Sequence, residues 1–194
     1  MVAIPAGFSP QEYLALEREN VVRHEYRCGL VYAMAGGSDD HDELSLNLIE
    51  LLRQHLRGGG CAVRSGNVKV NYRDAFFYYP DVFVTCDPRD REDRYVKRYP
   101  KFIAEVLSPS TEAFDRSSKF EDYQKIESLE EYTLISQEIV QVECRRRFRD
   151  TKIERWETEI YRSGDRVTFQ SVELEVAIEE LYQGVNLQSF DRLS

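Results

Sequence analysis

The sequence predicts an α/β fold in which a mixed β-sheet is flanked by helices and carries an added C-terminal β-meander. Two apolar runs, Val82–Cys86 and Phe102–Leu107, have the length and composition of buried strands. Leucines at helical spacing between Asp39 and Leu56 indicate a long helix before them, and Gly58-Gly59-Gly60 would end it. Beyond Ile139 the chain alternates polar and apolar residues over long segments, which is typical of a meander.

The first part of the chain is expected to form a short helix and a β-hairpin. Ser9-Pro10-Gln11-Glu12 is a capping box with proline at the first helical position, so an amphipathic helix should begin there. Segments 21–26 and 30–34 flank Arg27-Cys28-Gly29 and have the length of paired strands. Gly36-Gly37-Ser38 then interrupts the chain before the long helix.

The middle of the chain should supply most of the sheet and one further helix. We expect strands at 62–72 (bent at Gly66), 76–79, 82–86, 102–107 and 132–136, with a mobile charged loop at 87–101. Ser110 or Thr111 can cap a helix that continues to about Glu127. The apolar face of that helix would hold Phe114, Phe120, Tyr123 and Ile126.

The last part should form the meander and close a single domain. Its alternating segments are 140–148, 153–161 and 167–170, and a short helical turn is expected within 176–182. No Pro-, Gly- or Ser-rich linker divides the 194 residues, so we expect one domain over residues 1–194.

The charge balance limits the classes of partner. A net charge of −9 argues against a non-specific nucleic-acid coat and against binding to an anionic membrane. It does not exclude an enzyme that holds a metal through carboxylates and contacts a polyanion through a local basic patch. No targeting segment or membrane-spanning run is visible, which predicts a soluble, cytoplasmic protein without a membrane partner. Cys28, Cys61, Cys86 and Cys144 show no CxxC spacing, so we expect reduced, mostly packed thiols.

Two carboxylates lie at the ends of the predicted buried strands. Asp81 follows Pro80 at the start of one strand, and Glu105 lies near the end of the other. If the strands pair, both acids can face one pocket. Carboxylates are seldom buried unless they are paired or bind a cation, because the loss of hydration costs several kcal/mol. A divalent metal is the simplest compensation.

A resemblance to a known family is carried by residues spread over most of the chain. They are Arg23-His24-Glu25-Tyr26 with Gly29, residues 32–37, His41, Pro80-Asp81-Val82, residues 105–111, Asp115 with Lys119 and Tyr123, and Glu131-Tyr132. This ordered set resembles the Uma-two branch of the PD-(D/E)XK nuclease superfamily, whose members are restriction-endonuclease-like proteins. The resemblance implies a restriction-endonuclease-like core and a single nuclease-like domain over residues 1–194.

The resemblance also implies roles for individual residues. Asp81 and Glu105 would bind Mg²⁺ with help from the backbone carbonyl of Val106, and Mn²⁺ should be able to substitute. The superfamily usually has a lysine two residues after the second acid, where this chain has Leu107. The matching lysine in this branch is Lys119 on the following helix, which would orient the attacking water. Glu25 would join the site from the hairpin as an additional catalytic acid.

Each assignment competes with a structural interpretation. Asp81 could be a turn residue that binds local backbone N–H groups, and an arginine could pair with Glu105. Asp115 and Lys119 could form an ion pair on a solvated helix, and Glu25 could pair with Arg23 or Arg27.

Three further features are open to two interpretations each. His41 is more often a capping or packing residue in such a position than a member of a site. The run 145–149 is rich in arginine and could contact phosphates, although a charged edge strand is the simpler account. Aromatic residues 76–79 are expected in the core or an interface rather than on a base-stacking surface.

Two functions from different classes follow. The first is a Mg²⁺-dependent endonuclease that hydrolyses DNA as a homodimer, since two sites are usually needed to cut both strands. The second is a catalytically idle nuclease-fold module that binds nucleic acid or a protein. Retention of Asp81, Glu105 and a candidate lysine favours the first, whereas Leu107 and the acidic charge favour the second.

Overall fold

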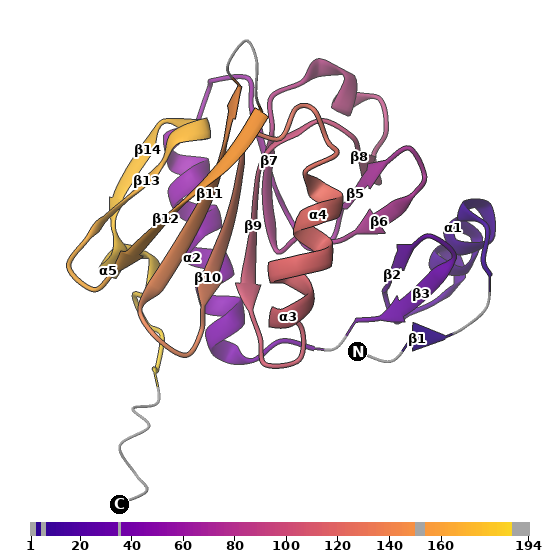
Figure 1. Cartoon of the computed structure of the whole chain (residues 1–194), viewed down its shortest axis with the longest axis horizontal. Helices are drawn as coiled ribbons and strands as arrows, with labels where there is room; N and C mark the ends of the chain where they lie inside the picture. The colour runs from indigo at the N-terminus through magenta and orange to yellow at the C-terminus, as the bar shows by residue number, and fades with distance from the viewer. Residues whose placement is uncertain (1–2, 5–6, 35, 150–153, 188–194) are drawn as a thin grey trace, which may run out of the picture.

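A six-stranded sheet forms the centre of the computed structural model, which describes residues 3–4, 7–34, 36–149 and 154–187 (Figure 1). The strands lie in the order β12 (Glu154–Arg162), β11 (Gln141–Arg149), β10 (Glu131–Ser136), β9 (Pro100–Leu107), β7 (Val82–Thr85) and β4 (Ala62–Ser65). Strand β9 runs parallel to β10, with Glu105 opposite Leu134, and the other neighbours are antiparallel. The predicted mixed sheet is therefore confirmed, and the end of β9 lies beside the start of β7.

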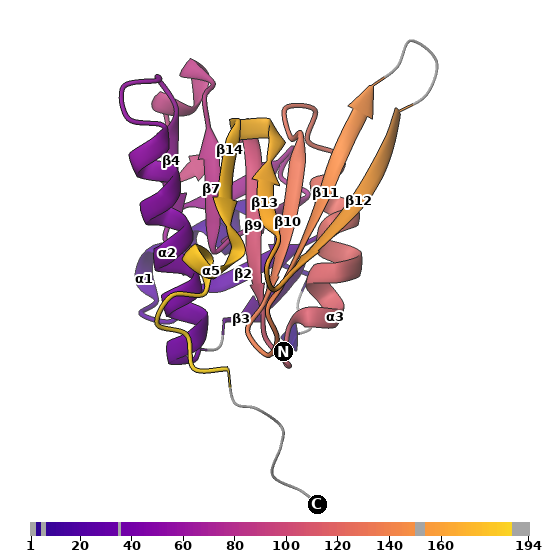
Figure 2. The same cartoon turned by 90° about the vertical axis from the view of Figure 1, so that its left-hand side faces the viewer.

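One face of this central sheet is covered by α2 and by the C-terminal elements (Figure 2). Helix α2 (Asp39–His55) buries Leu44, Leu48 and Leu52 against the sheet. Beside it lie the hairpin of β13 (Arg166–Phe169) and β14 (Leu174–Ala177), the 3-10 turn η3 (Gln170–Val172) that joins them, and α5 (Ile178–Leu181). This apolar layer closes the face opposite to the candidate site residue Glu105.

The other face is covered by a short, irregular helical segment. It consists of α3 (Glu112–Phe114), the π-helical turn η2 (Asp115–Lys119) and α4 (Phe120–Tyr123). Aromatic rings dominate its contacts: Tyr123 lies edge-on to Phe76 and Tyr78, and Phe120 stacks on Tyr132. The continuous helix expected between residues 110 and 127 is thus interrupted, and the interruption falls on the segment that carries Lys119.

A second sheet packs against this aromatic layer. Its order is β1 (Ala3–Ile4), β3 (Leu30–Ala33), β2 (His24–Arg27), β6 (Phe76–Tyr78), β5 (Lys69–Tyr72) and β8 (Val96–Lys97). Helix α1 (Pro10–Glu19) covers its outer side through Tyr13, whose ring stacks on Tyr26. The capping box predicted for Ser9 and Glu12 is present, and the β2–β3 hairpin forms where the sequence placed it.

Several boundaries differ from the sequence predictions. Segment 62–72 is two strands in two different sheets, β4 and β5, separated at the turn that contains Gly66. The expected meander is divided as well: β11 and β12 extend the central sheet, whereas β13 pairs with β14. The predicted strand start at Ile153 lies outside the described residues.

The charged loop at 87–101 is ordered by one buried carboxylate. It contains the 3-10 turn η1 (Pro88–Arg91) as well as β8. Asp90 accepts hydrogen bonds from Thr85 Oγ1 at 2.6 Å and from the backbone N–H of Arg98 at 2.8 Å. The segment expected to be a mobile loop thus contains two short elements, and the internal carboxylate joins its two ends.

The cysteines also differ from expectation. Cys61 and Cys86 form a disulfide next to the β4–β7 ladder, whereas Cys28 and Cys144 are free thiols. The prediction of reduced thiols throughout is wrong. Ala62 pairs with Thr85 in antiparallel strands, so the neighbouring residues Cys61 and Cys86 lie side by side. No helix in the described part of the chain is long and apolar enough to span a membrane.

Candidate active site

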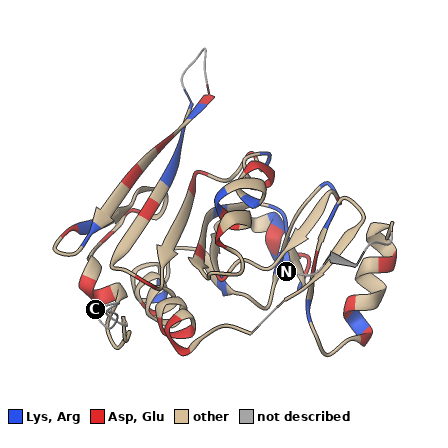
Figure 3. Cartoon of the chain, turned by 60° about the horizontal axis from the view of Figure 1, so that its bottom comes forward, with Lys and Arg blue, Asp and Glu red and all other residues tan. Residues whose placement is uncertain are grey.

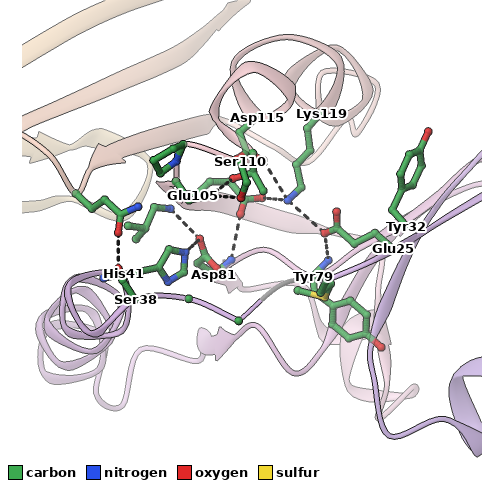
Figure 4. Close-up of a pocket in the computed structure, with 18 of the residues that line it drawn as sticks. Glu25, Tyr32, Ser38, His41, Tyr79, Asp81, Glu105, Ser110, Asp115 and Lys119 are labelled. Carbon is green, nitrogen blue, oxygen red and sulfur yellow. Dashed lines mark hydrogen bonds and ion pairs between the residues drawn. The ribbon is translucent and has the colours of Figure 1, made fainter. Parts of the chain in front are cut away.

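A cavity of about 380 Å³ opens where β9 ends and β7 begins (Figure 4). Its wall comes from β2, from β3 and the residues after it, from the start of α2, from the segment before β7, from the end of β9, from the α3–η2 segment and from the turn after β10. The polar residues in this wall are Glu25, Ser38, His41, Asp81, Glu105, Ser108, Ser110, Thr111, Asp115, Lys119 and Gln137. The structure therefore brings all four predicted catalytic residues and Val106 to one cavity.

Asp81 is the most accessible of the predicted acids. Its side chain is 20 % exposed, and Oδ2 accepts the backbone N–H of Val106 at 2.8 Å. The backbone N–H of Asp81 in turn donates to Glu105 Oε2 at 3.3 Å. Asp81 is thus held by the neighbouring strand β9, and its bond to a residue 25 positions away contradicts the interpretation as a local turn residue.

Glu105 lies inside an apolar strand and is almost fully buried. Its Oε1 lies 3.0 Å from Lys119 Nζ and accepts the Tyr123 hydroxyl at 3.2 Å. Burial raises the pKa of Glu105 well above its usual range, Lys119 lowers it, and the nearby Asp81, Asp115 and Glu25 raise it again. The predicted alternative, pairing with an arginine, is wrong because the partner is a lysine.

Lys119 occupies the centre of the cluster. Its Nζ lies 3.0 Å from Glu105, 3.2 Å from Glu25 and 3.4 Å from Asp115. Burial alone would lower the pKa of Lys119, but Glu105, Glu25 and Asp115 raise it well above the ordinary value. The ammonium group is therefore held charged, and the interpretation as a solvated surface pair is wrong because Lys119 and Asp115 are both buried.

The π-helical turn explains how the lysine reaches the strand. A π-turn inserts one additional residue into a helix, which changes the direction of the side chains on either side. Asp115 and Lys119 both point towards Glu105 (Figure 4), and the Tyr132 hydroxyl fixes the turn by donating to the Asp115 carbonyl at 2.9 Å. Leu107, at the usual lysine position, packs instead into the aromatic layer.

Glu25 enters the cavity from strand β2. The backbone N–H of Tyr79 donates to Glu25 Oε1 at 2.9 Å, and Lys119 Nζ contacts the same oxygen. Burial raises the pKa of Glu25, although Lys119 and the Tyr79 N–H oppose the shift. The predicted alternative partners are engaged elsewhere: Arg23 donates to the Gly66 carbonyl, and Arg27 donates to Asp122.

His41 belongs to this cluster, which the sequence analysis did not favour. It lies in the first turn of α2, where its backbone N–H donates to Ser38 Oγ, and its Nε2 lies 3.2 Å from Asp81 Oδ2. Burial would lower the pKa of His41, but the hydrogen bond and charge of Asp81, with Asp42 and Asp115, raise it. The only sequence feature that pointed to His41 as a site residue was its place in the family resemblance. For Gln137, which accepts from Ser38 Oγ at 2.5 Å, the sequence offered none.

The structure also bears on the two remaining segments, the arginine-rich run 145–149 and the aromatic run 76–79. Strand β11 lies between β10 and β12, so residues 145–149 are not an edge strand. Figure 3 shows the basic residues of β11 beside acidic ones on β12. Arg146 pairs with buried Glu131 at 3.0 Å and Arg145 with Glu143 at 2.7 Å, which leaves these cations compensated within the fold. Residues 76–79 are buried in the core, as expected.

The donor chemistry of the cavity fits a hard divalent cation. Glu25, Asp81, Glu105 and Asp115 face one lysine and one histidine, so the cluster holds more negative than positive charge. N–H and C=O of one strand residue point to the same side, so the Val106 carbonyl faces Asp81 as its N–H does. Among the described residues, no three His, Cys, Asp or Glu side chains are already arranged around a metal position. Carboxylate and carbonyl oxygens are the ligands that Mg²⁺ prefers, usually together with water.

Comparison with known proteins places these features in a family. The chain is 39 % identical over 178 residues to the protein slr1290 of Synechocystis, covering 91 % of this chain and 92 % of the relative. A second Synechocystis protein, sll1609, is 31 % identical over 146 residues and is covered to 82 %.

A solved structure shares the fold. It is a crystal structure titled as a putative nuclease belonging to DUF820 from Anabaena variabilis, with a TM-score of 0.74, 17 % identity, and coverage of 91 % of this chain and 98 % of that one. The restriction-endonuclease-like, nuclease-type fold expected from the sequence is therefore confirmed. Residues 10–179 match the family model Uma2, which is described as "Putative restriction endonuclease", and the chain therefore belongs to the Uma2 family.

Proposed function

We propose that the protein is a metal-dependent endonuclease that hydrolyses phosphodiester bonds of DNA. The observation that carries the proposal is the placement of Lys119 Nζ 3.0 Å from Glu105, on a carboxylate cluster that also holds Asp81. An acid pair on adjacent strand ends, with a charged amine beside it, can hold a cation and orient a water. The family and the nuclease-type fold support a nucleic-acid substrate.

Each residue has a proposed role in the site. Asp81, Glu105 and the Val106 carbonyl would hold Mg²⁺, for which Mn²⁺ can substitute, and the bound cation would neutralise phosphate charge and acidify a water. Lys119 orients the attacking water and stabilises negative charge as it develops. Glu25 acts through Lys119 and the water, since it contacts the lysine at 3.2 Å.

The reaction is an in-line hydrolysis. The water oxygen bonds to phosphorus, the bond from phosphorus to the 3′-oxygen breaks, and a proton passes to the departing 3′-oxygen. The products are one 5′-phosphate and one 3′-hydroxyl end. We further propose that the protein is a single domain over residues 1–194 and works as a homodimer, because two sites are needed to cut both strands of a duplex.

The idle-module alternative has its own supporting observation. Lys119 is buried and contacts three carboxylates, so each of these acids already has a cationic partner without any metal. A cluster satisfied in this way could serve only to join β2, β9 and η2. The two functions make different predictions for metal binding and for cleavage.

Cleavage of supercoiled plasmid with Mg²⁺, Mn²⁺ or EDTA tests the proposal. We expect metal-dependent nicking that falls about 10²- to 10³-fold or more in Asp81→Asn and Lys119→Ala, because each removes a charge from the reacting centre. Lys125→Ala is the matched control, since Lys125 is a half-exposed lysine that pairs with Asp122 away from the cavity.

Calorimetry with Mn²⁺ separates the possible failures. If the native protein binds Mn²⁺ but neither it nor the variants nick DNA, the DNA substrate is wrong and the metal site stands. If Mn²⁺ does not bind and no nicking occurs, the metal-dependent nuclease is overturned in favour of the idle module.

A further inference from the structure

Two cations lie against Tyr79, a residue that lines the cavity, and a third lies close enough to act on one of them. Arg18 is on α1, Arg23 precedes β2, and Lys69 begins β5; we call these three residues the basic strip. The Arg23 guanidinium carbon lies 5.9 Å from the centre of the Tyr79 ring, and Lys69 Nζ lies 4.8 Å from it. Tyr79 lines the cavity, and its backbone N–H binds Glu25. Tyr79 thus lies between the acidic cluster and two members of the basic strip, Arg23 and Lys69, and the charge of Arg18 reaches Lys69.

The carboxylates nearest to the basic strip are engaged by other groups. Glu17 accepts the backbone N–H and Nδ1 of His24 through one oxygen and the Tyr79 hydroxyl, at 2.7 Å, through the other. Asp93 accepts the backbone N–H groups of Tyr95 and Val96. Within the part of the chain that the structure describes, none of the three cations forms an ion pair with a carboxylate.

The electrostatics of Lys69 agree with this crowding of positive charge. Burial lowers the pKa of Lys69, Glu17 and Asp93 raise it, and Arg18 and Arg23 lower it, with a lowered pKa as the result. Arg18 and Arg23 are exposed, so the positive charge of the basic strip faces solvent. An anion placed there would stabilise all three side chains.

An exposed aromatic residue lies next to the basic strip. The Tyr95 side chain is 73 % exposed, and the Tyr95 carbonyl accepts the backbone N–H of Lys69 at 3.0 Å. Basic residues beside an exposed aromatic ring are typical of surfaces that follow a nucleic-acid backbone and stack a base. In a chain with a net charge of −9, such contacts must be local to be effective.

We propose that the basic strip binds the phosphodiester backbone of the substrate strand next to the scissile bond and guides it into the cavity. This inference rests on the proposed function only in taking the cavity as the cleavage site. Arg18, Arg23 and Lys69 contact phosphates and not bases, so they contribute affinity and position rather than sequence preference. They are positioning residues, separate from the acids and Lys119 that act on the reacting atoms.

Binding without cleavage tests this surface. The protein with Asp81→Asn is titrated in EDTA against a fluorescent DNA duplex of about 20 base pairs, at salt concentrations from about 50 to 300 mM. The triple variant Arg18→Gln, Arg23→Gln, Lys69→Gln is compared with Arg53→Gln, Arg57→Gln, Arg162→Gln. The control set removes the same charge from exposed positions on or after α2 and at the end of β12, away from Tyr79.

We expect the basic-strip variant to bind at least about tenfold more weakly at the lowest salt, while the control stays close to the parent. The slope of log affinity against log salt should become shallower by about 0.9 for each phosphate that the variant no longer neutralises. Equal weakening in both sets, or no binding by the parent, overturns the proposal. A parallel titration with an RNA duplex of the same sequence identifies the polymer, and the basic-strip dependence is expected for whichever binds more tightly.

Two further variants keep the test independent of folding and of catalysis. Arg18→Gln changes only an exposed side chain, so it should weaken binding measurably without affecting thermal unfolding. Lys69→Arg keeps the positive charge and should bind DNA as the parent does. Native protein that binds DNA through the basic strip but never nicks plasmid supports the basic strip as a phosphate-binding surface and overturns the nuclease. If the native protein nicks plasmid and the triple variant binds DNA as tightly as the parent, the nuclease stands and the basic-strip inference is overturned.

Discussion

Lys119 reaches the cavity from a helical turn, whereas the strand position two residues after Glu105 is filled by Leu107. Alternate residues of a strand point to the same face, so Glu105 and Leu107 share the face that η2 covers. A lysine on either element could therefore bring its ammonium group to the same carboxylate. The position of the amine relative to Glu105, rather than its place in the sequence, should decide whether the site works.

A positional swap tests this at single-residue resolution. Lys119→Leu should reduce nicking about 10²- to 10³-fold, because the variant has no positive charge beside Glu105. Adding Leu107→Lys to that variant should recover at least about tenfold of the rate, since the exchange conserves the two side-chain types. Rates are measured on plasmid, with thermal unfolding as the check on folding; a double variant no faster than Lys119→Leu contradicts the expectation.

Among single residues, the acids were the most predictable. Asp81 and Glu105 stand out because Asp81 directly precedes an apolar strand and Glu105 interrupts one, which are local properties of the sequence. The role of Lys119 came from the family resemblance, since its spacing from Asp115 also fits a solvated pair. His41 could not be ranked: its contact with Asp81 spans 40 residues and exists only once α2 packs beside β7.

At the scale of elements, α4 is joined to the second sheet by one buried carboxylate. Asp122 accepts hydrogen bonds from Arg27 Nε at 2.6 Å, Tyr78 Oη at 2.7 Å and Lys125 Nζ at 2.6 Å. Burial alone would raise the pKa of Asp122, but these three donors lower it below the ordinary value. The carboxylate therefore connects β2, β6 and the helical segment that carries Lys119.

We expect Asp122→Asn to lower the free energy of unfolding at neutral pH by about 2 kcal/mol, because it removes charged hydrogen bonds. A depressed folded pKa means that the unfolded state binds more protons in acid, so this contribution is present above the unfolded pKa of about 3.9 and is lost as pH falls through the folded value. Urea unfolding from pH 7 to 2 measures it. The gap between native and variant protein should close in acid; a constant gap contradicts the assignment. Asp74→Asn, at an exposed turn, is the control.

Element types were predicted better than their partners. Periodicity located α1, α2 and the strands of the central sheet, because hydrophobic spacing is local. It could not reveal that β4 and β5 belong to different sheets or that β13 leaves the central one, since an alternating strand has the same pattern in any sheet. The π-turn was equally hidden, as an amphipathic pattern does not report one additional residue in a turn.

At the scale of the whole molecule, the Cys61–Cys86 disulfide joins the segment after α2 to the end of β7 across 25 residues. A cross-link of this length stabilises mainly by restricting the unfolded chain, by about 3 kcal/mol. Cys61→Ser with Cys86→Ser should therefore lower the urea midpoint, and reductant should lower the native midpoint to the same value.

Cys28→Ser is the control for that measurement, because Cys28 is an exposed free thiol. Thiol counting under denaturing conditions should give two reactive groups before reduction and four after it. Four groups before reduction, with a midpoint insensitive to reductant, would show that the bridge does not form. The disulfide could not be predicted from the sequence, because cysteine spacing carries no information about which strands become neighbours.

The outer strand of the central sheet restricts how two copies can meet. Strand β12 presents Glu154, Arg155, Glu157 and Glu159 along an open row of backbone groups, most of them exposed. Charged edges of this kind resist pairing with a strand of another molecule. Continuation of the sheet through β12 into a second copy is therefore disfavoured, and a partner in the proposed homodimer would meet another surface. The same charged edge should also oppose fibre-like association of free copies through β12.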